Sequence, residues 1–292
     1  MSNVTIGLFG EEIQEKTVLR DDYIEPPFSV LDARSGDWQL RKNKWRGLGI
    51  RSEVGRNAVA VHIGTTYGEK GRGEMSEYTS IFDPHLCEVI YKWFCPDGGS
   101  ILDPFAGGSV RGIVAGYLGY KYRGIDIREE QIESNLEQVA EILGDDAKVE
   151  YDLGDSNIIL DRIKEEYDLV FSCPPYADLE VYSDLPGDIS NMPYPVFRSA
   201  YQSIIYKSCE KLKRGGYAVF VVGEVRNPKS QIGGFYGLVP DTIRAFLDAG
   251  MTYYNEGILV TSVGSGSMRA NGNMKSGKLV KTHQNILCFK KN

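Results

Sequence analysis

Several features that mark other classes of protein are missing from this chain of 292 residues. No run of 18 apolar residues occurs, so we expect no membrane-spanning helix. The first residues lack the basic-then-apolar order of a secretory signal. The five cysteines form no C-x-x-C pair and the three histidines lie far apart, so we expect no structural metal. Such cysteine usage is typical of a reduced, intracellular protein.

Negative charge prevails in the chain, but it is unevenly distributed. The net charge is −7, and residues 126–168 alone hold 15 acidic and 4 basic residues. Two segments are basic: residues 34–56 hold seven basic and two acidic residues, and residues 268–292 hold six basic and none acidic. A basic segment is often only a solvated surface. Two of them flanking a catalytic core raise nucleic acid as a partner.

From residue 100 onward, apolar strand patterns alternate with helical patterns. We expect strands at 100–105, 121–127, 147–155, 167–175 and 217–225, and two closing strands at 251–263 and 283–291 with no helix between them. This order predicts an α/β fold with a doubly wound, mostly parallel, seven-stranded Rossmann-like sheet. The closing strands predict a C-terminal antiparallel hairpin at one edge.

The residues before this pattern carry weaker signals. Trp38 and Trp45 are seven apart, on one face of a short helix for which Asp37 is a candidate cap. We favour packing over base stacking for this tryptophan pair. Asp83 and Pro84 predict the start of the next helix.

The stretch ILDPFAGGSVRG, from Ile101, has the composition of a ligand-binding loop. Gly107 and Gly108 allow a close backbone approach and positive φ, Ser109 is a candidate helix cap, and Gly112 would let the helix pack closely on a strand. The spacing does not fit the dinucleotide motif G-x-G-x-x-G, and no G-K-[ST] follows. A carboxylate at Asp103 would repel phosphate and attract a ligand that carries positive charge.

Acidic residues follow the next two strands as well. Asp126 is placed to accept both hydroxyls of a ribose, and Asp155 to contact an adenine amino group. Capping of helices is the alternative for both residues. Taken together, the set favours a nucleoside ligand with positive charge over a phosphate ligand.

A second unusual strand end is SCPPY, residues 172–176. Two prolines make this turn rigid and leave carbonyl groups available as acceptors, and Tyr176 offers a ring face. A planar base with an exocyclic amino group would fit such a turn. Taken alone, the turn is equally consistent with a rigid end to a strand.

The two stretches together resemble the S-adenosylmethionine-dependent DNA amino-methyltransferases, which act on adenine N6 or cytosine N4. DPFAGG is similar to their cofactor motif, SCPPY to their catalytic motif [DNS]PP[YFW], and FDPHLCEVIYKWF to the helix that encloses the methionine part. The resemblance covers about residues 78–292 and is strongest to methylases of phages and mobile elements. It implies a methyltransferase sheet, a DNA partner and the cytoplasm of a bacterial host cell.

The resemblance also implies which residues form the site. The cofactor S-adenosylmethionine would be bound by Asp103, Pro104, Phe105, Ala106, Gly107, Gly108, Ser109, Asp126, Ile127, Asp155 and Ser156. The target base would be held by Cys173, Pro174, Pro175 and Tyr176. Cys173 departs from the family pattern, because sulfur is a poor acceptor where Asp, Asn or Ser is usual.

Because of Cys173, three reactions stay open for the predicted methyltransferase, and two rival functions remain beside them. Adenine N6 is favoured as the acceptor, with cytosine N4 second, and Cys173 as a covalent nucleophile is a further alternative. An RNA or protein-amide methyltransferase is a rival function. So is a nucleic-acid-binding module with a decayed site.

DNA contacts would have to come from outside the sheet. We divide the chain into an N-terminal basic and aromatic segment, 1–77, and a methyltransferase domain, 78–292, with a flexible basic loop at 263–282. Phosphate contact is favoured over base readout for most of their cations, which are Arg41, Lys42, Lys44, Arg46, Arg51, Arg56, Arg269, Lys275, Lys278 and Lys281. Residues 177–192 would form either a lid or a plain surface loop. The oligomeric state stays open, with a dimer as one of its options.

Overall fold

A computed structural model describes residues 22–51, 82–176, 182–227, 230, 232–264 and 266–292 of the chain. It also describes two short strands near the N-terminus, β1 (Thr5–Ile6) and β2 (Glu12–Ile13), which pair antiparallel. The boundary expected between residues 77 and 78 lies outside the described residues, so the division into two parts stays a prediction.

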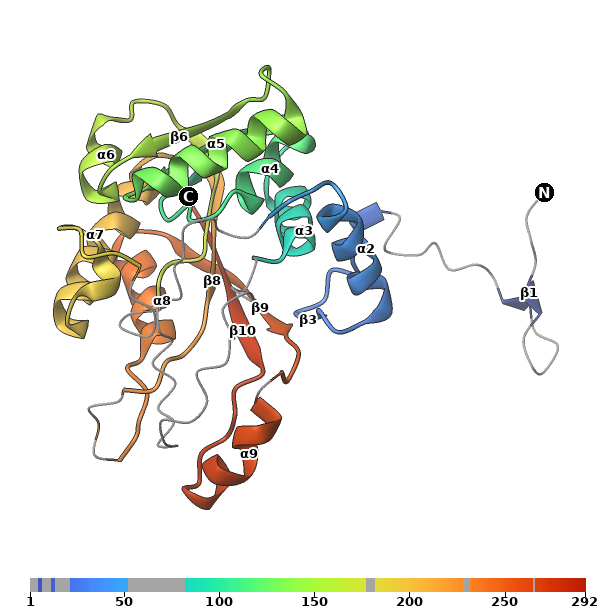
Figure 1. Cartoon of the computed structure of the whole chain (residues 1–292), viewed down its shortest axis with the longest axis vertical. Coiled ribbons are helices and arrows are strands. Elements are labelled where there is room, and N and C mark those ends of the chain that lie inside the picture. The colour runs from blue at the N-terminus through green and yellow to red at the C-terminus, as the bar shows by residue number, and fades with distance from the viewer. Residues whose placement is uncertain are drawn as a thin grey trace.

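The centre of the fold is one sheet with the strand order β3-β9-β10-β8-β7-β4-β5-β6 (Figure 1). Its strands are β3 (Val30–Asp32), β4 (Ser100–Asp103), β5 (Lys121–Asp126), β6 (Val149–Leu153), β7 (Tyr167–Ser172), β8 (Leu212–Val222), β9 (Thr252–Val260) and β10 (His283–Lys290). Only β10 runs antiparallel to its neighbours. The α/β class, the mostly parallel sheet and the C-terminal antiparallel hairpin are confirmed.

An eighth strand joins the seven expected ones. β3 pairs parallel with β9, with Leu31 opposite Leu259, so the hairpin does not form the edge of the sheet. With three residues, β3 is too short to show a period-two pattern, and the sequence therefore did not indicate it.

Helices cover both faces of this sheet. They are α2 (Gly36–Arg46), α3 (Pro84–Phe94), α4 (Val110–Tyr117), α5 (Glu129–Leu143), α6 (Ser156–Arg162), α7 (Tyr194–Glu210), α8 (Leu238–Asp248) and α9 (Gly266–Lys275). Side chains of α2 to α5 pack in one buried cluster and those of α6 to α8 in a second. Successive residues of a strand point to opposite faces of the sheet and so belong to different clusters: Phe171 is in the first cluster and its neighbour Val170 in the second.

The expected helix starts are confirmed for α3 and corrected for α2. Asp83 caps α3, where its carboxylate accepts hydrogen bonds from the backbone of His85 and Leu86. In α2 the capping side chain is Ser35, which accepts from the Trp38 backbone N–H, and not Asp37. An N-cap oxygen reaches the amide two or three residues on, and Ser35 has this position.

The segment at 263–282 is not only a loop. It contains α9, which extends from the end of the β9–β10 hairpin away from the rest of the sheet (Figure 1). The glycine- and asparagine-rich sequence has no apolar stripe, so sequence periodicity did not indicate a helix there.

The chain order creates a switch point between β4 and β7. These strands are parallel neighbours, with Leu102 opposite Val170. After β4 the chain continues to β5 on one side, and after β7 it continues to β8 on the other. The loops that follow β4 and β7 therefore diverge at one edge, which is where open α/β sheets bind ligands.

Candidate functional site

A cavity of about 740 Å³ opens at this edge of the sheet. Its lining includes twelve of the fifteen site residues predicted from sequence. These are Pro104, Phe105, Gly107, Gly108, Asp126, Ile127, Asp155, Ser156, Cys173, Pro174, Pro175 and Tyr176. The residues predicted to bind the cofactor and those predicted to bind the base are far apart in the sequence, and the structure places both sets around one cavity.

Asp103 does not line the cavity. Its side chain is fully buried, and its carboxylate accepts hydrogen bonds from Tyr122 (2.8 Å), Ser172 (2.6 Å) and the Phe105 backbone (3.1 Å). Arg111 forms an ion pair with it. The expectation that Asp103 offers its charge to a ligand is therefore corrected, because four internal donors use this carboxylate.

The buried Arg111 guanidinium is the centre of the glycine loop. Burial lowers its pKa, but the charge of Asp103, the neighbouring Tyr122 and Cys173 and the hydrogen bond to Asp103 together outweigh burial and raise the pKa well above its ordinary value. Its Nη2 also donates to the carbonyl groups of Phe105 and Ala106, at 2.5 and 2.7 Å. Arg111 thus ties the end of β4 to the start of α4 and fixes the loop before any ligand binds.

Gly107 provides the turn in this loop. It has φ +52°, a conformation that side chains with a Cβ adopt at a cost. Its N–H donates to Asp126 Oδ2 at 2.9 Å, and its carbonyl accepts from Asn135 Nδ2 at 2.7 Å. Gly108 is not among the residues with positive φ, so the expectation of positive φ holds for one glycine of the pair.

Three further residues of this stretch, Ala106, Ser109 and Gly112, are buried inside the protein. Ala106 donates its N–H to the Ile125 carbonyl at 2.9 Å and is fully buried. Ser109 occupies the N-cap position of α4, but its side chain makes no capping bond, and its buried Oγ has no hydrogen-bond partner among the described residues. A Cβ on Gly112 would overlap the Tyr151 hydroxyl, so the close packing of α4 on the sheet is confirmed.

The two acidic strand ends face the cavity and also bond to the backbone. Asp126 accepts from the Arg128 N–H at 2.9 Å, in addition to Gly107. Asp155 caps α6 by accepting from the Asn157 N–H at 2.8 Å. A carboxylate has about four acceptor positions, so capping and ligand contact are compatible roles for one side chain.

The SCPPY turn contributes a fixed tyrosine. Tyr176 Oη accepts from Gln284 Nε2 at 2.7 Å and lies 3.5 Å from Cys173 Sγ. The ring is close to Gly223, where an added Cβ would be 3.7 Å from Cε2. Burial, and then the neighbouring Cys173, raise the pKa of Tyr176 well above its ordinary value, so its hydroxyl stays protonated at neutral pH.

Ser172 joins this turn to the glycine loop. It is fully buried and donates to Asp103 Oδ1 across the switch point. Ser172 therefore cannot replace Cys173 as the side chain that meets a ligand. Cys173 is half-buried and lines the cavity.

Residues 182–192, the described part of the segment expected to form a lid or a surface loop, contribute to the wall of the cavity near Asp155. Tyr182, Gly187, Asp188 and Ile189 line the cavity, and Asp188 caps a short 3-10 helix, Ile189–Asn191. Gly187 has φ +94°, and a Cβ there would be 3.0 Å from Asp155 Oδ2. Residues 177–181 lie outside the described residues.

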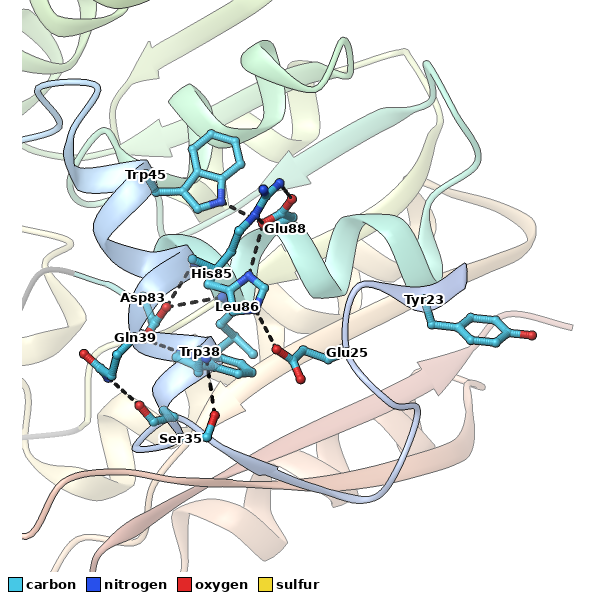
Figure 2. A network of polar contacts seen from close by, with 12 residues as sticks. Tyr23, Glu25, Ser35, Trp38, Gln39, Trp45, Asp83, His85, Leu86 and Glu88 are labelled. Atoms are coloured by element: carbon cyan, nitrogen blue, oxygen red, sulfur yellow. Dashed lines mark hydrogen bonds and ion pairs between the residues drawn. The ribbon is translucent and has the colours of Figure 1, made fainter. Parts of the chain in front are cut away.

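Two carboxylates, the buried Glu88 and the half-buried Asp83, connect the N-terminal segment to α3 (Figure 2). Glu88 accepts from Trp45 Nε1 at 2.7 Å and forms an ion pair with Arg41. Asp83 accepts from Trp38 Nε1 at 3.1 Å and from Lys42 Nζ at 3.0 Å. Both tryptophans are almost fully buried, so packing rather than base stacking is confirmed for them.

The other described basic residues of the N-terminal segment make no ion pair with α3. Arg51 pairs with the exposed Glu141 of α5. Arg46 lines the cavity, and neither it nor Lys44 has an ion pair in the described part of the chain. Arg56 lies outside the described residues.

Sequence patterns did not indicate Arg111, Asn135 or Gln284. Each acts at a distance in sequence: Asn135 on Gly107, and Gln284 on Tyr176, 108 positions away. Of the three, only Arg111 has a signal in the sequence, since it is the second residue of α4 and a basic residue there can neutralise Asp103. The other two contacts come from the packing of α5, which carries Asn135, and from the position of β10, which carries Gln284.

Among the described residues, no group of His, Cys, Asp and Glu side chains is arranged to hold a metal ion. All five cysteines are described, and they form no disulfide. In the same residues, no helix is long and apolar enough to cross a bilayer.

No family model and no curated protein matches this chain. Solved structures with similarity include TrmN from Thermus thermophilus, with 14% identity, TM-score 0.48, and 72% of this chain and 49% of that chain covered. Others are magnesium protoporphyrin IX methyltransferase of Synechocystis with bound SAM (13% identity, TM-score 0.46, coverage 72% and 79%) and a proposed RNA methyltransferase of Pyrococcus horikoshii (15% identity, TM-score 0.49, coverage 86% and 98%). The chain spans about half the length of TrmN. Similarities this weak carry no argument about activity, so function must be inferred from the cavity.

Proposed function

We propose that this chain transfers a methyl group from S-adenosylmethionine to the exocyclic amino group of a base in DNA. Adenine N6 is the favoured acceptor and cytosine N4 the second. The observation that carries the proposal is that the glycine loop after β4 and the SCPPY turn after β7 open into one cavity. Ser172 and Asp103 join them through a hydrogen bond of 2.6 Å.

The cofactor half of the cavity suits a nucleoside with positive charge. Gly107 and Gly108 line it as half-buried glycines, and the carboxylates of Asp126 and Asp155 supply hydrogen-bond acceptors. We assign Asp126 to the ribose hydroxyls and Asp155 to the adenine amino group. The half-buried ring of Phe105 adds an apolar wall.

The base half holds a flat ring against Tyr176. Because Gln284 Nε2 donates to Tyr176 Oη, the hydroxyl proton is available to Cys173 Sγ at 3.5 Å. These contacts fix the tyrosine ring, which can then stack on a base that has left the duplex. The rigid turn at Pro174 and Pro175 holds its backbone in place.

S-adenosylmethionine, when bound, supplies an electrophilic methyl group and a neutral thioether as leaving group. The protein has to hold the amino nitrogen in line with that methyl carbon, about 3 to 3.5 Å away. We assign the Pro174 carbonyl to accept a hydrogen bond from one amino N–H, which directs the nitrogen lone pair toward the methyl. Transfer would form a C–N bond and break the C–S bond of the bound S-adenosylmethionine, and the second amino proton would leave to water.

With Cys173 at this position, the orientation of the amino group depends mainly on the backbone carbonyl of Pro174. A sulfur atom is a weak acceptor, and here it lies next to the Tyr176 hydroxyl. The usual oxygen side chain would add a second strong acceptor for the amino group, at about 1 kcal/mol for a hydrogen bond. We therefore expect Cys173→Asn to transfer methyl groups about 5- to 10-fold faster than the natural chain.

Two assays test the two halves of the cavity separately. Titration calorimetry with S-adenosylmethionine tests the proposed cofactor half, and a methyl-transfer assay on unmodified DNA tests the proposed base half. Gly107→Ala places a Cβ at φ +52° in the loop and should weaken cofactor binding more than 10-fold. Gly98→Ala is the matched control, because Gly98 has φ +70° with nothing within 4 Å of an added Cβ. Tyr176→Ala should retain cofactor affinity and lose transfer.

The results also separate the rival functions. Cofactor binding without transfer to DNA, but with transfer to RNA or to a protein amide, would replace the DNA proposal. A chain that binds DNA and no cofactor would be a binding module with a decayed site.

A further inference from the structure

Residues 261–282 connect β9 to β10, and we call this segment the arm. It makes few contacts with the rest of the described fold. Its helix α9 stands away from the sheet (Figure 1). Every residue from Ser267 to Gly272 is exposed, and Met268 is 81% exposed. Gly266 is the one buried residue of the helix, against Val280.

A helix of this kind needs a partner. It has ten residues, two of them glycines, and isolated helices shorter than about 12 to 15 residues are marginal in water. Within the described residues, no other helix or strand packs along α9. Its stability therefore calls for a surface that is not part of this chain's described fold.

The charge of the arm identifies the partner as a polyanion. From residue 268 to the last residue the sequence has no acidic side chain, and Arg269 and Lys275 are exposed without an ion pair among the described residues. The arm also starts at the site. Thr261 and Ser262, its first two residues, and Gln284, just after its end, line the cavity. A polyanion on the arm would thus reach the cavity.

The outer face of α9 has the composition of a base-reading surface. Positions 268, 271, 272 and 275 follow the i, i+3, i+4, i+7 spacing of one helical face, opposite the buried Gly266. Asn271 and Lys275 are side-chain types that bond adenine and guanine edges, and Met268 can contact a thymine methyl. Gly272 between them lets the helix approach closely.

We propose that α9 reads the sequence of duplex DNA from the major groove, beside the base that enters the cavity. The inference rests on the proposed DNA substrate and names the element that selects its sequence. Asn271 and Lys275 contact base edges. Arg269, on the flank of this face, contacts phosphate and adds affinity without sequence preference.

The test is methylation of a duplex library with randomised sequence, followed by mapping of the modified sites. Asn271→Ala should relax the preference at one position of the recognised sequence, with a loss of about 10-fold at the preferred sequence. Arg269→Ala should keep the preference, weaken duplex binding at every sequence, and lower the salt slope of log K by about 1. Lys164→Ala, an exposed cation before β7 at a distance from the arm, should change neither.

Duplex binding by fluorescence anisotropy keeps the inference testable if no methyl transfer occurs. Wild type should then still bind a duplex more tightly than Arg269→Ala does. Equal duplex affinity in both, or an unchanged sequence preference in Asn271→Ala, would overturn the role of α9. A wild-type chain that binds no cofactor would instead contradict the proposed function, and the anisotropy result would still decide the role of the arm.

Discussion

The two basic segments of the chain look alike in sequence and differ in what their cations contact. In the N-terminal segment, Arg41 and Lys42 pair with the carboxylates of Glu88 and Asp83 on α3. In the arm, Arg269 and Lys275 have no acidic neighbour along the chain and are exposed. The first set of charges holds the protein together, whereas the second is available to a partner. A basic run therefore indicates a nucleic-acid surface only after its acidic neighbours in space are known.

The largest effect should come from the carboxylate that fastens the N-terminal segment. Glu88→Gln removes the buried charge that Arg41, Trp45 and His85 share. A hydrogen bond to a charged group contributes about 1.5 to 3 kcal/mol, and the neutral amide keeps only part of these contacts, so we expect a loss of about 3 kcal/mol of unfolding free energy, which urea titration measures. Glu141→Gln, at the exposed pair with Arg51, is the control and should cost less than about 1 kcal/mol. Equal losses in both variants would mean that burial does not distinguish these pairs.

A second comparison uses the same substitution in both segments. Arg41→Ala removes one charged partner of the buried Glu88 but leaves its contacts with Trp45 and His85, so we expect a loss of about 2 kcal/mol in unfolding free energy. Arg269→Ala removes an exposed side chain and should stay within about 0.5 kcal/mol. If Arg269→Ala destabilised the isolated protein as much as Arg41→Ala, the arm would be part of the folded core.

The acid dependence of stability should report the same carboxylate. Burial raises the pKa of Glu88, but hydrogen bonds from Arg41, His85 and Trp45 outweigh burial and lower the pKa from 4.5 to about 2. The folded state thus binds its proton less readily than the unfolded state, so the stabilisation is present above pH 4.5 and is lost as the pH falls toward 2. The stability difference between wild type and Glu88→Gln should shrink over this window, as urea titrations at several pH values would show. A constant difference would exclude Glu88 as the group that titrates.

The smallest effect should appear at the base half of the cavity. Gln284→Ala removes the donor to Tyr176 Oη, and one hydrogen bond of about 1 kcal/mol corresponds to a loss of about 5-fold in kcat/KM. Glu256→Gln changes an exposed side chain on β9 that accepts a hydrogen bond from Asn285, and it should leave kcat/KM unchanged. The effect of Gln284→Ala should disappear in a Tyr176→Phe background, and its persistence there would contradict a role through the hydroxyl.

Local sequence patterns were sufficient for most of the fold. The strands at 100–105 and 167–175 were visible because each is a compact apolar run that ends in a distinctive turn. β3 and α9 were not visible, since β3 is three residues long and α9 has no apolar face. β3 depends on its pairing with β9, which only the assembled sheet provides, whereas α9 stands away from the sheet (Figure 1).

The site was predictable where its chemistry lies within one short stretch. Gly107 and Tyr176 were found because the loop and the turn each carry their own signal. The role of Asp103 was misjudged, because the donors that surround it come from β5, β7 and α4 and meet only in the fold. The same reason hid Gln284, which reaches Tyr176 from the other end of the chain.

The most direct test of the proposed activity is incubation of the full chain with isotope-labelled S-adenosylmethionine and unmodified DNA, followed by mass spectrometry of the digested nucleosides. We predict label in N6-methyladenine, with N4-methylcytosine as the second product of the same class. Label in 5-methylcytosine would make Cys173 a nucleophile and contradict transfer to an exocyclic amino group. No label in any nucleoside, with measurable cofactor binding, would contradict DNA as the substrate.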